Sequence, residues 1–106
     1  MADTAMIVAA LLALAPVAAA SGITPERQAQ LEHMVVQDCG SCHGLTMKGG
    51  LGRPITPEAL SAHDPRTLAA IILDGLPGTA MPPWRPLLTE AEALWIADYL
   101  KKEKAQ

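Results

Sequence analysis

The 106-residue chain is predicted to fold entirely as α-helices, about three or four of them. Three helix N-terminal signals each precede apolar residues at helical spacing. These signals are Thr24-Pro25, Asp64-Pro65 and the capping box Thr89–Glu92. No stretch of useful length alternates between apolar and polar residues as a half-buried strand would. These observations predict the all-α class, with helices joined by loops.

The first predicted helix starts at residue 25, and Leu31 and Val35 lie on its apolar face. We expect this helix to run up to the pair of cysteines. A loop over residues 44–57 follows, because glycines and prolines crowd that stretch. A short helical turn is expected over residues 57–60.

The second main helix is predicted to follow Asp64, with Leu68 and Ile72 on its apolar face, and to stop at Gly75. A proline-rich loop over residues 76–88 separates it from the last helix. The apolar residues of the last helix are Trp95, Ile96, Tyr99 and Leu100. Lysines follow them, where the negative end of the helix dipole favours cations.

The run Cys39-Gly40-Ser41-Cys42-His43 is the most specific motif of the chain. Cys-x-x-Cys-His is the attachment motif of c-type haem. Two thiols one helical turn apart can each form a thioether with a haem vinyl group, and His43 can then bring an imidazole nitrogen to the iron. The motif predicts one haem c, held by Cys39 and Cys42 with His43 as an iron ligand.

Three different interpretations of the two cysteines are weaker. A thioredoxin-like redox pair needs a strand–helix–strand context, which the chain lacks. A structural zinc site needs four well-placed ligands, and His43 directly after Cys42 is poorly placed to share one tetrahedral metal with it. A disulfide between Cys39 and Cys42 would close only a very small loop and stabilise little.

Composition agrees with a haem domain. Half of the residues are hydrophobic, yet the chain has no phenylalanine, two tryptophans and one tyrosine. A flat apolar haem would fill a core that these residues leave under-filled. The net charge of −3, with no basic patch, argues against nucleic acid as a partner.

The N-terminus has the pattern of an export signal. Residues 7–20 are apolar and end in three alanines, which favours a signal peptide over residues 1–20 and a haem domain over 21–106. The basic residues that normally open a signal are missing, so a retained membrane anchor stays open as the alternative. In either case the haem domain is expected outside the cytoplasm.

Met81 is the best candidate for the second axial ligand of the iron. It lies in the loop between the second and last helices, and Pro82 and Pro83 hold the chain extended there. Met47 follows His43 too closely to reach the opposite face. His63, just before the second main helix, is the rival ligand.

Three side chains are candidates for contact with the haem propionates, namely Arg53, Trp84 and Arg85. A packing role for Trp84 and solvated arginines are the alternatives. The backbone carbonyl of Arg53 or of Pro54 is expected to accept a hydrogen bond from the outer nitrogen of His43, which would orient the ring.

The order of helix, Cys39–His43, helix, Met81 loop and Leu94–Leu100 resembles a small class I cytochrome c. The stretches around the haem motif and over 72–88 resemble, more narrowly, the monohaem cytochromes of nitrite-reduction gene clusters, the NirC or cytochrome c55X type. One departure is Gly52-Arg53-Pro54-Ile55, where cytochromes c commonly have Gly-Pro-x-Leu. The resemblance implies a cytochrome c fold wrapped around one covalent haem.

The same resemblance implies that the first and last helices cross and pack, through Leu31 or Val35 against Ile96 and Leu100. It further implies a periplasmic electron carrier, not an enzyme, that is expected to be monomeric. The implied partner is the dissimilatory nitrite reductase, and a role in maturing haem d is also suggested.

An iron with both axial positions filled favours one-electron transfer over substrate binding. Two further functions stay open: a general shuttle to a terminal oxidase, and a ligand-binding or sensor protein if the bond to Met81 is labile. The expected docking patch for a redox partner is the apolar rim at Cys39, Leu51, Leu76 and Pro82. The alternative is that Leu51 and Leu76 only shield the haem.

Overall fold

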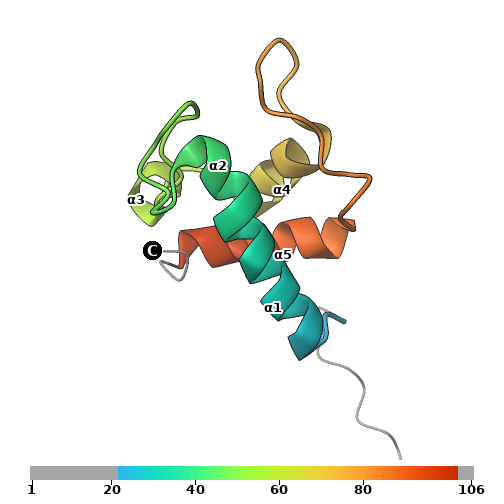
Figure 1. The fold of residues 1–106 in the computed structure, drawn as a ribbon. Coiled ribbons are helices and arrows are strands. Elements are labelled where there is room, and N and C mark those ends of the chain that lie inside the picture. The colour runs from blue at the N-terminus through green and yellow to red at the C-terminus, as the bar shows by residue number, and fades with distance from the viewer. Residues whose placement is uncertain (1–21, 103–106) are drawn as a thin grey trace, which may run out of the picture.

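The computed structural model describes residues 22–102, and within that range every regular element is helical. The elements are α1 (Pro25–Met34), the π-helical turn η1 (Val35–Cys39), α2 (Gly40–His43), α3 (Pro57–Leu60), α4 (Pro65–Asp74) and α5 (Glu90–Lys101). Figure 1 shows α1 crossing α5, with α4 beside α5 and the long loops at one end of the molecule. The predicted all-α class is confirmed.

Three side-chain caps begin the main helices where the sequence predicts them. Thr24 accepts a hydrogen bond from the Arg27 amide at 3.1 Å, and Asp64 accepts one from the Arg66 amide at 2.7 Å. At α5 the capping box is complete, because the Thr89 hydroxyl accepts from the Glu92 amide and the Glu92 carboxylate accepts from the Thr89 amide. Each cap satisfies amides that the first helical turn leaves without partners.

From the sequence we expected the first helix to end at the haem motif, but the helical structure runs through the motif. It continues through η1 into α2, so that residues 25–43 form one helical segment. The π-helical turn holds one more residue than an α-helical turn and rotates the residues that follow it. Gly44, with φ of 91°, then ends the segment.

The crossing of α1 and α5 forms the centre of the core. Leu31 and Val35 are fully buried, and Ile96 and Leu100 are 1% and 6% exposed. All four belong to one hydrophobic cluster, to which α4 contributes Ala69 and Leu73. The packing of the first helix against the last, implied by the family resemblance, is therefore confirmed.

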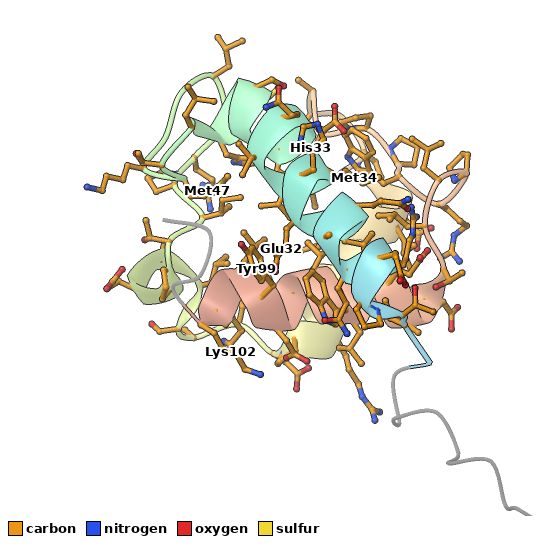
Figure 2. The ribbon with its side chains drawn as sticks, turned by 60° about the horizontal axis from the view of Figure 1, so that its bottom comes forward. Glu32, His33, Met34, Met47, Tyr99 and Lys102 are labelled. Carbon is orange, nitrogen blue, oxygen red and sulfur yellow. The ribbon has the colours of Figure 1, made fainter. Side chains whose placement is uncertain are left out.

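Two aromatic rings stack along α5. The rings of Trp95 and Tyr99 stack with centroids 5.2 Å apart and an interplanar angle of 12°. Figure 2 shows Tyr99 pointing from α5 toward α1, where Glu32 lies. Burial raises the pKa of the Tyr99 hydroxyl, and the nearby negative charge of Glu32 raises it further.

The loop after α2 contributes a residue to the core. Met47 is fully buried although it lies in a glycine-rich stretch, and its φ of 61° turns the chain inward. The amide of Ile55 donates to the Met47 carbonyl at 2.9 Å and closes the loop behind it. Met47 therefore fills the core, and its exclusion as an iron ligand stays a prediction.

A lysine links the end of α5 to the short helix α3. The ammonium group of Lys101 donates to the carbonyl of Leu60 at 2.9 Å and to that of His63 at 2.6 Å. The Leu60 carbonyl ends α3, and the His63 carbonyl lies in the turn between α3 and α4. The contact fixes the chain between α3 and α4.

No helix among residues 22–102 is long and apolar enough to cross a membrane. The predicted export signal over residues 1–20 lies outside the described residues, so its cleavage or retention stays a prediction.

Candidate haem-binding site

Both cysteines of the motif are free thiols, as attachment to haem vinyl groups requires. Cys39 ends η1 and is half-buried, whereas Cys42 lies in α2 and is exposed. Burial, reinforced by the negative charge of Asp38, raises the pKa of the Cys39 thiol to about 11. A raised pKa favours the thiol over the more reactive thiolate.

The ring of His43 is oriented by a backbone carbonyl. Its Nδ1 lies 2.7 Å from the carbonyl oxygen of Arg53. A carbonyl can only accept, so we assign the proton to Nδ1, which leaves the lone pair on Nε2. This is the arrangement that a metal-binding imidazole needs, because the hydrogen bond fixes its tautomer and makes it a stronger donor. Of the two carbonyls that the sequence left open, the structure selects Arg53.

The loop that supplies this carbonyl is fastened to the end of α2. The amides of Gly49 and Gly52 donate to the carbonyls of His43 and Cys42, both at 2.7 Å. A Cβ at Gly52 would lie 2.8 Å from Nδ1 of His43 and 2.9 Å from its Cε1. Only glycine lets the loop approach the imidazole so closely. Sequence reasoning placed Gly52 in a loop but missed this role, which depends on the loop folding back.

Met81 lies on the loop that follows α4 and is held by contacts within that loop. The Met81 carbonyl accepts from the Leu76 amide at 3.3 Å, and a Cβ at Gly75 would lie 2.6 Å from that carbonyl oxygen. The Met81 side chain is half-buried. Figure 1 shows this loop rising at the same end of the molecule as α2. Ligation of the iron by Met81 stays a prediction.

The three propionate candidates lie in different surroundings. Trp84 is half-buried and packs against the core cluster, which favours its packing role. Arg85 donates from Nε and Nη2 to the two carboxylate oxygens of Asp74, at 2.8 and 3.0 Å. The side chain of Arg53 is exposed. Contact of these side chains with propionates stays a prediction.

The pair formed by Asp74 and Arg85 was not found from the sequence. Its hydrogen bonds lower the pKa of the Asp74 carboxyl and raise that of the Arg85 guanidinium. Asp74 ends α4 and Arg85 follows the Met81 loop, so the pair depends on a fold that brings these two positions together. His63, the rival ligand, has an exposed side chain.

The predicted docking patch is largely exposed. Leu51 is 96% and Leu76 43% exposed, Pro82 is exposed and Cys39 is half-buried. Leu45, which the sequence reasoning did not single out, is 72% exposed in the same loop as Leu51. Exposed leucines beside the haem motif are consistent with a surface that contacts other proteins.

Comparison with known proteins agrees with the geometry. Residues 26–100 match the family model described as cytochrome c oxidase, cbb3-type, subunit III. The chain is 59% identical over 96 residues to cytochrome c55X of Paracoccus denitrificans (strain Pd 1222), which covers 91% of this chain and 93% of that protein. It is 49% identical over 87 residues to cytochrome c55X of Stutzerimonas stutzeri, covering 82% and 77%.

Two solved structures share this fold. The c-type cytochrome NirC matches with a TM-score of 0.75 and 49% identity, over 77% of this chain and 96% of that chain. The dihydro-haem d1 dehydrogenase NirN, in complex with DHE, matches with a TM-score of 0.62 and 35% identity, over 67% of this chain but 15% of that one.

The residues present fit a covalently attached haem. Two free thiols lie one turn apart, and next to them an imidazole is held by a carbonyl with its Nε2 available. Gly52, which has no side chain, leaves the His43 ring the room it needs. Proteins of this kind hold one haem c, with its iron, and act as electron carriers. The chain therefore belongs to the cytochrome c55X family of c-type cytochromes, within the larger family of the cbb3-type subunit III model.

Proposed function

We propose that this cytochrome is a periplasmic one-electron carrier of nitrite reduction whose iron is held by His43 and Met81. The observation that supports it most is the hydrogen bond between His43 Nδ1 and the Arg53 carbonyl, which prepares Nε2 as a ligand. Haem, when bound, supplies a redox couple that takes up or releases one electron. Two protein ligands leave no position for a substrate, and a thioether ligand favours a relatively high potential.

Each part of the chain has a separate task in this proposal. His43 would bind the iron with its ring held by the Arg53 carbonyl, a contact that Gly52 allows. Met81 would supply the second ligand, from a loop whose end is held to α4 by the Trp84 and Arg85 amides. Because both ligands are positioned by hydrogen bonds remote from the iron, little rearrangement should accompany a change of its charge.

The proposed electron acceptor is the dissimilatory nitrite reductase. Support comes from the similarity to cytochrome c55X and to NirC, the cytochrome type of nitrite-reduction gene clusters. A carrier must leave its partner after each transfer, so the interface should be small. The docking patch of Cys39, Leu51, Leu76 and Pro82 suits such a contact. The net charge of −3 is small, so the transfer rate should depend only mildly on salt.

A second candidate is a role in haem d maturation. It is favoured by the similarity to part of a dihydro-haem d1 dehydrogenase of Pseudomonas aeruginosa, 36% identical over 69 residues, or 14% of that protein. Dehydrogenation of a dihydro compound releases two electrons and two protons. Two molecules of a one-electron carrier would accept those electrons, with the protons passing to solvent. The remaining candidate functions are a shuttle to a terminal oxidase and a ligand sensor.

Stopped-flow mixing of the reduced cytochrome with oxidised nitrite reductase from the same source tests the proposal. We expect oxidation of the cytochrome on the time scale of nitrite turnover, with mild salt dependence. Leu51→Asp should slow the reaction by placing a charge in the docking patch. Leu87→Asp is the matched control, because Leu87 is 60% exposed and lies outside the patch.

Failure of nitrite reductase to oxidise the wild-type cytochrome would exclude the donor role. The same instrument then tests the second candidate, by mixing the oxidised cytochrome with a dihydro-haem d1 dehydrogenase and its substrate. Reduction of the cytochrome in that mixture alone would assign it to maturation. Binding of carbon monoxide to the reduced wild-type protein would instead favour the sensor.

A further inference from the structure

We propose that Asp74 and Arg85 form a clamp that closes the loop bearing Met81 and so positions Met81 on the iron. The inference rests on the proposed ligation by Met81 and adds two positioning residues to it. The clamp is defined as the ion pair between these two side chains, and the loop as residues 75–84 between them.

The ion pair of the clamp is bidentate. Nε of Arg85 lies 2.8 Å from Oδ1 of Asp74, and Nη2 lies 3.0 Å from Oδ2. Two parallel hydrogen bonds between a guanidinium and a carboxylate fix the orientation of both groups. Nη1 of Arg85 also lies 3.7 Å from the Glu90 carboxylate, at the start of α5. The guanidinium therefore links the end of α4, the end of the loop and the start of α5.

The clamp lies where the two ends of the loop come together, between residues 72–74 and 84–85, and we call this region the neck of the loop. Next to it, the amides of Trp84 and Arg85 donate to the carbonyls of Ile72 and Leu73, both at 3.0 Å. Within the described part of the chain, the hydrogen bonds of residues 76–83 stay inside the loop. The position of Met81 thus depends on the neck, because the rest of the loop has no hydrogen bond to another element there.

The charge of Asp74 points to a role for the pair. Asp74 is the last residue of α4, where the negative end of the helix dipole disfavours a carboxylate. Arg85 compensates for this unfavourable position. Both side chains are about half exposed, 59% for Asp74 and 51% for Arg85. An exposed pair contributes little to global stability, so its effect should be confined to opening of the loop.

The clamp also gives Arg85 a different task from contact with a haem propionate. The two roles are separable, because Asp74→Asn breaks the clamp and leaves the guanidinium in place. Arg85→Gln removes both. If the clamp is the role, both variants speed cyanide binding. Arg85→Gln does so at least as much as Asp74→Asn, because it leaves Asp74 uncompensated at the end of α4, and the double variant is no worse than Arg85→Gln.

The test uses the ferric holoprotein and two readouts. One is the weak far-red absorption band of sulfur–iron coordination. The other is the rate of cyanide binding, which requires Met81 to leave the iron. We expect Asp74→Asn and Arg85→Gln each to keep the band at rest and to speed cyanide binding about two- to fivefold, the range for loss of one well-formed exposed pair. The charge-swapped double variant, Asp74→Arg with Arg85→Asp, should return part of the way to the wild-type rate.

Glu92→Gln is the matched control. It weakens the ion pair between Arg27 and Glu92, which lies at the contact of α1 with α5 rather than at the neck. It should leave the cyanide rate unchanged. An equal acceleration in Glu92→Gln would mean that any loss of stability opens the loop, and would overturn the clamp.

Failures of the two proposals are distinguishable. A wild-type protein without the far-red band would refute ligation by Met81 and the clamp with it. A wild-type protein that has the band, with both clamp variants binding cyanide at the wild-type rate, would refute the clamp alone. An effect of Arg85→Gln without one of Asp74→Asn would refute the clamp and favour the propionate contact.

Discussion

At the scale of single residues, the orientation of His43 depends on a position with no side chain. The Arg53 carbonyl reaches Nδ1 of His43 at 2.7 Å because the chain at Gly52 passes close to the ring. A methyl group at Gly52 would overlap two ring atoms, at 2.8 and 2.9 Å. Either the ring or the loop would then have to move, and the hydrogen bond that sets the tautomer would weaken.

Gly52→Ala is therefore expected to raise the reduction potential and to lower the yield of haem-loaded protein, because a poorly held imidazole is a weaker donor and stabilises ferric iron less. Gly40→Ala is the matched control within the haem motif. A Cβ at Gly40 would meet its neighbours at 3.6 and 3.7 Å, ordinary contact distances. Redox titration and haem content check both variants. Equal behaviour of Gly52→Ala and the wild type would show that the ring does not need this contact.

Residues of the site differ in how far the sequence could predict them. Cys39, Cys42 and His43 follow from spacing alone, because the chemistry demands those residues in that order. The choice of Arg53 over Pro54 as the acceptor could not be predicted, since it depends on how the loop folds back on α2. Asp74 carries no motif, and only the fold brings it to Arg85.

At the scale of elements, the crossing of α1 with α5 stabilises the scaffold of the site. Ile96 is 1% exposed at this crossing and belongs to the same cluster as Leu31 and Val35. The helix starts were predictable because capping is local chemistry that the sequence displays. The π-helical turn η1 was not, because apolar spacing does not distinguish an α-helix from one with a single extra residue in a turn.

Ile96→Ala should lower the free energy of unfolding by about 2–4 kcal/mol, because it removes buried methyl groups and leaves a cavity. Denaturant unfolding of the holoprotein measures this. Leu87→Ala is the control, since Leu87 is 60% exposed, and it should cost less than about 0.5 kcal/mol. A cost that small for Ile96→Ala would contradict its place in the core.

A second element-scale prediction concerns acid. Arg27 hydrogen-bonds Glu92 and lowers the pKa of its carboxyl below the ordinary value of 4.5. The folded state therefore holds this proton less tightly than the unfolded chain does. The stabilisation is fully present above about pH 4.5 and is lost as the pH falls through the lowered pKa.

Glu92→Gln keeps an acceptor for the Thr89 amide but removes the charge. It should cost about 1 kcal/mol near neutral pH. The difference in unfolding free energy between the variant and the wild type should shrink as the pH is lowered to about 3. Unfolding curves across this range check the prediction, and a difference that stays constant would mean that the ion pair adds nothing.

At the scale of the whole molecule, one helical scaffold presents two separately anchored segments. The loop over 44–56 is fastened to α2 and orients His43, and the loop over 75–84 is fastened to α4 and bears Met81. Few aromatic side chains fill the core, as the composition suggested, with Trp95 and Tyr99 stacked on α5. The fold class was predictable because helix formation depends on residues close together in the sequence. No such local pattern identifies the redox partner.

The central claim is that His43 and Met81 fill both axial positions of the iron, so that the protein transfers electrons and binds no substrate. The most direct measurement is the far-red absorption band of the ferric protein in the wild type, Met81→Ala and His63→Ala. The account predicts a band in the wild type and in His63→Ala, and its loss in Met81→Ala together with a lower potential and binding of added ligands. A band that survives in Met81→Ala, or one that is lost in His63→Ala, would contradict it.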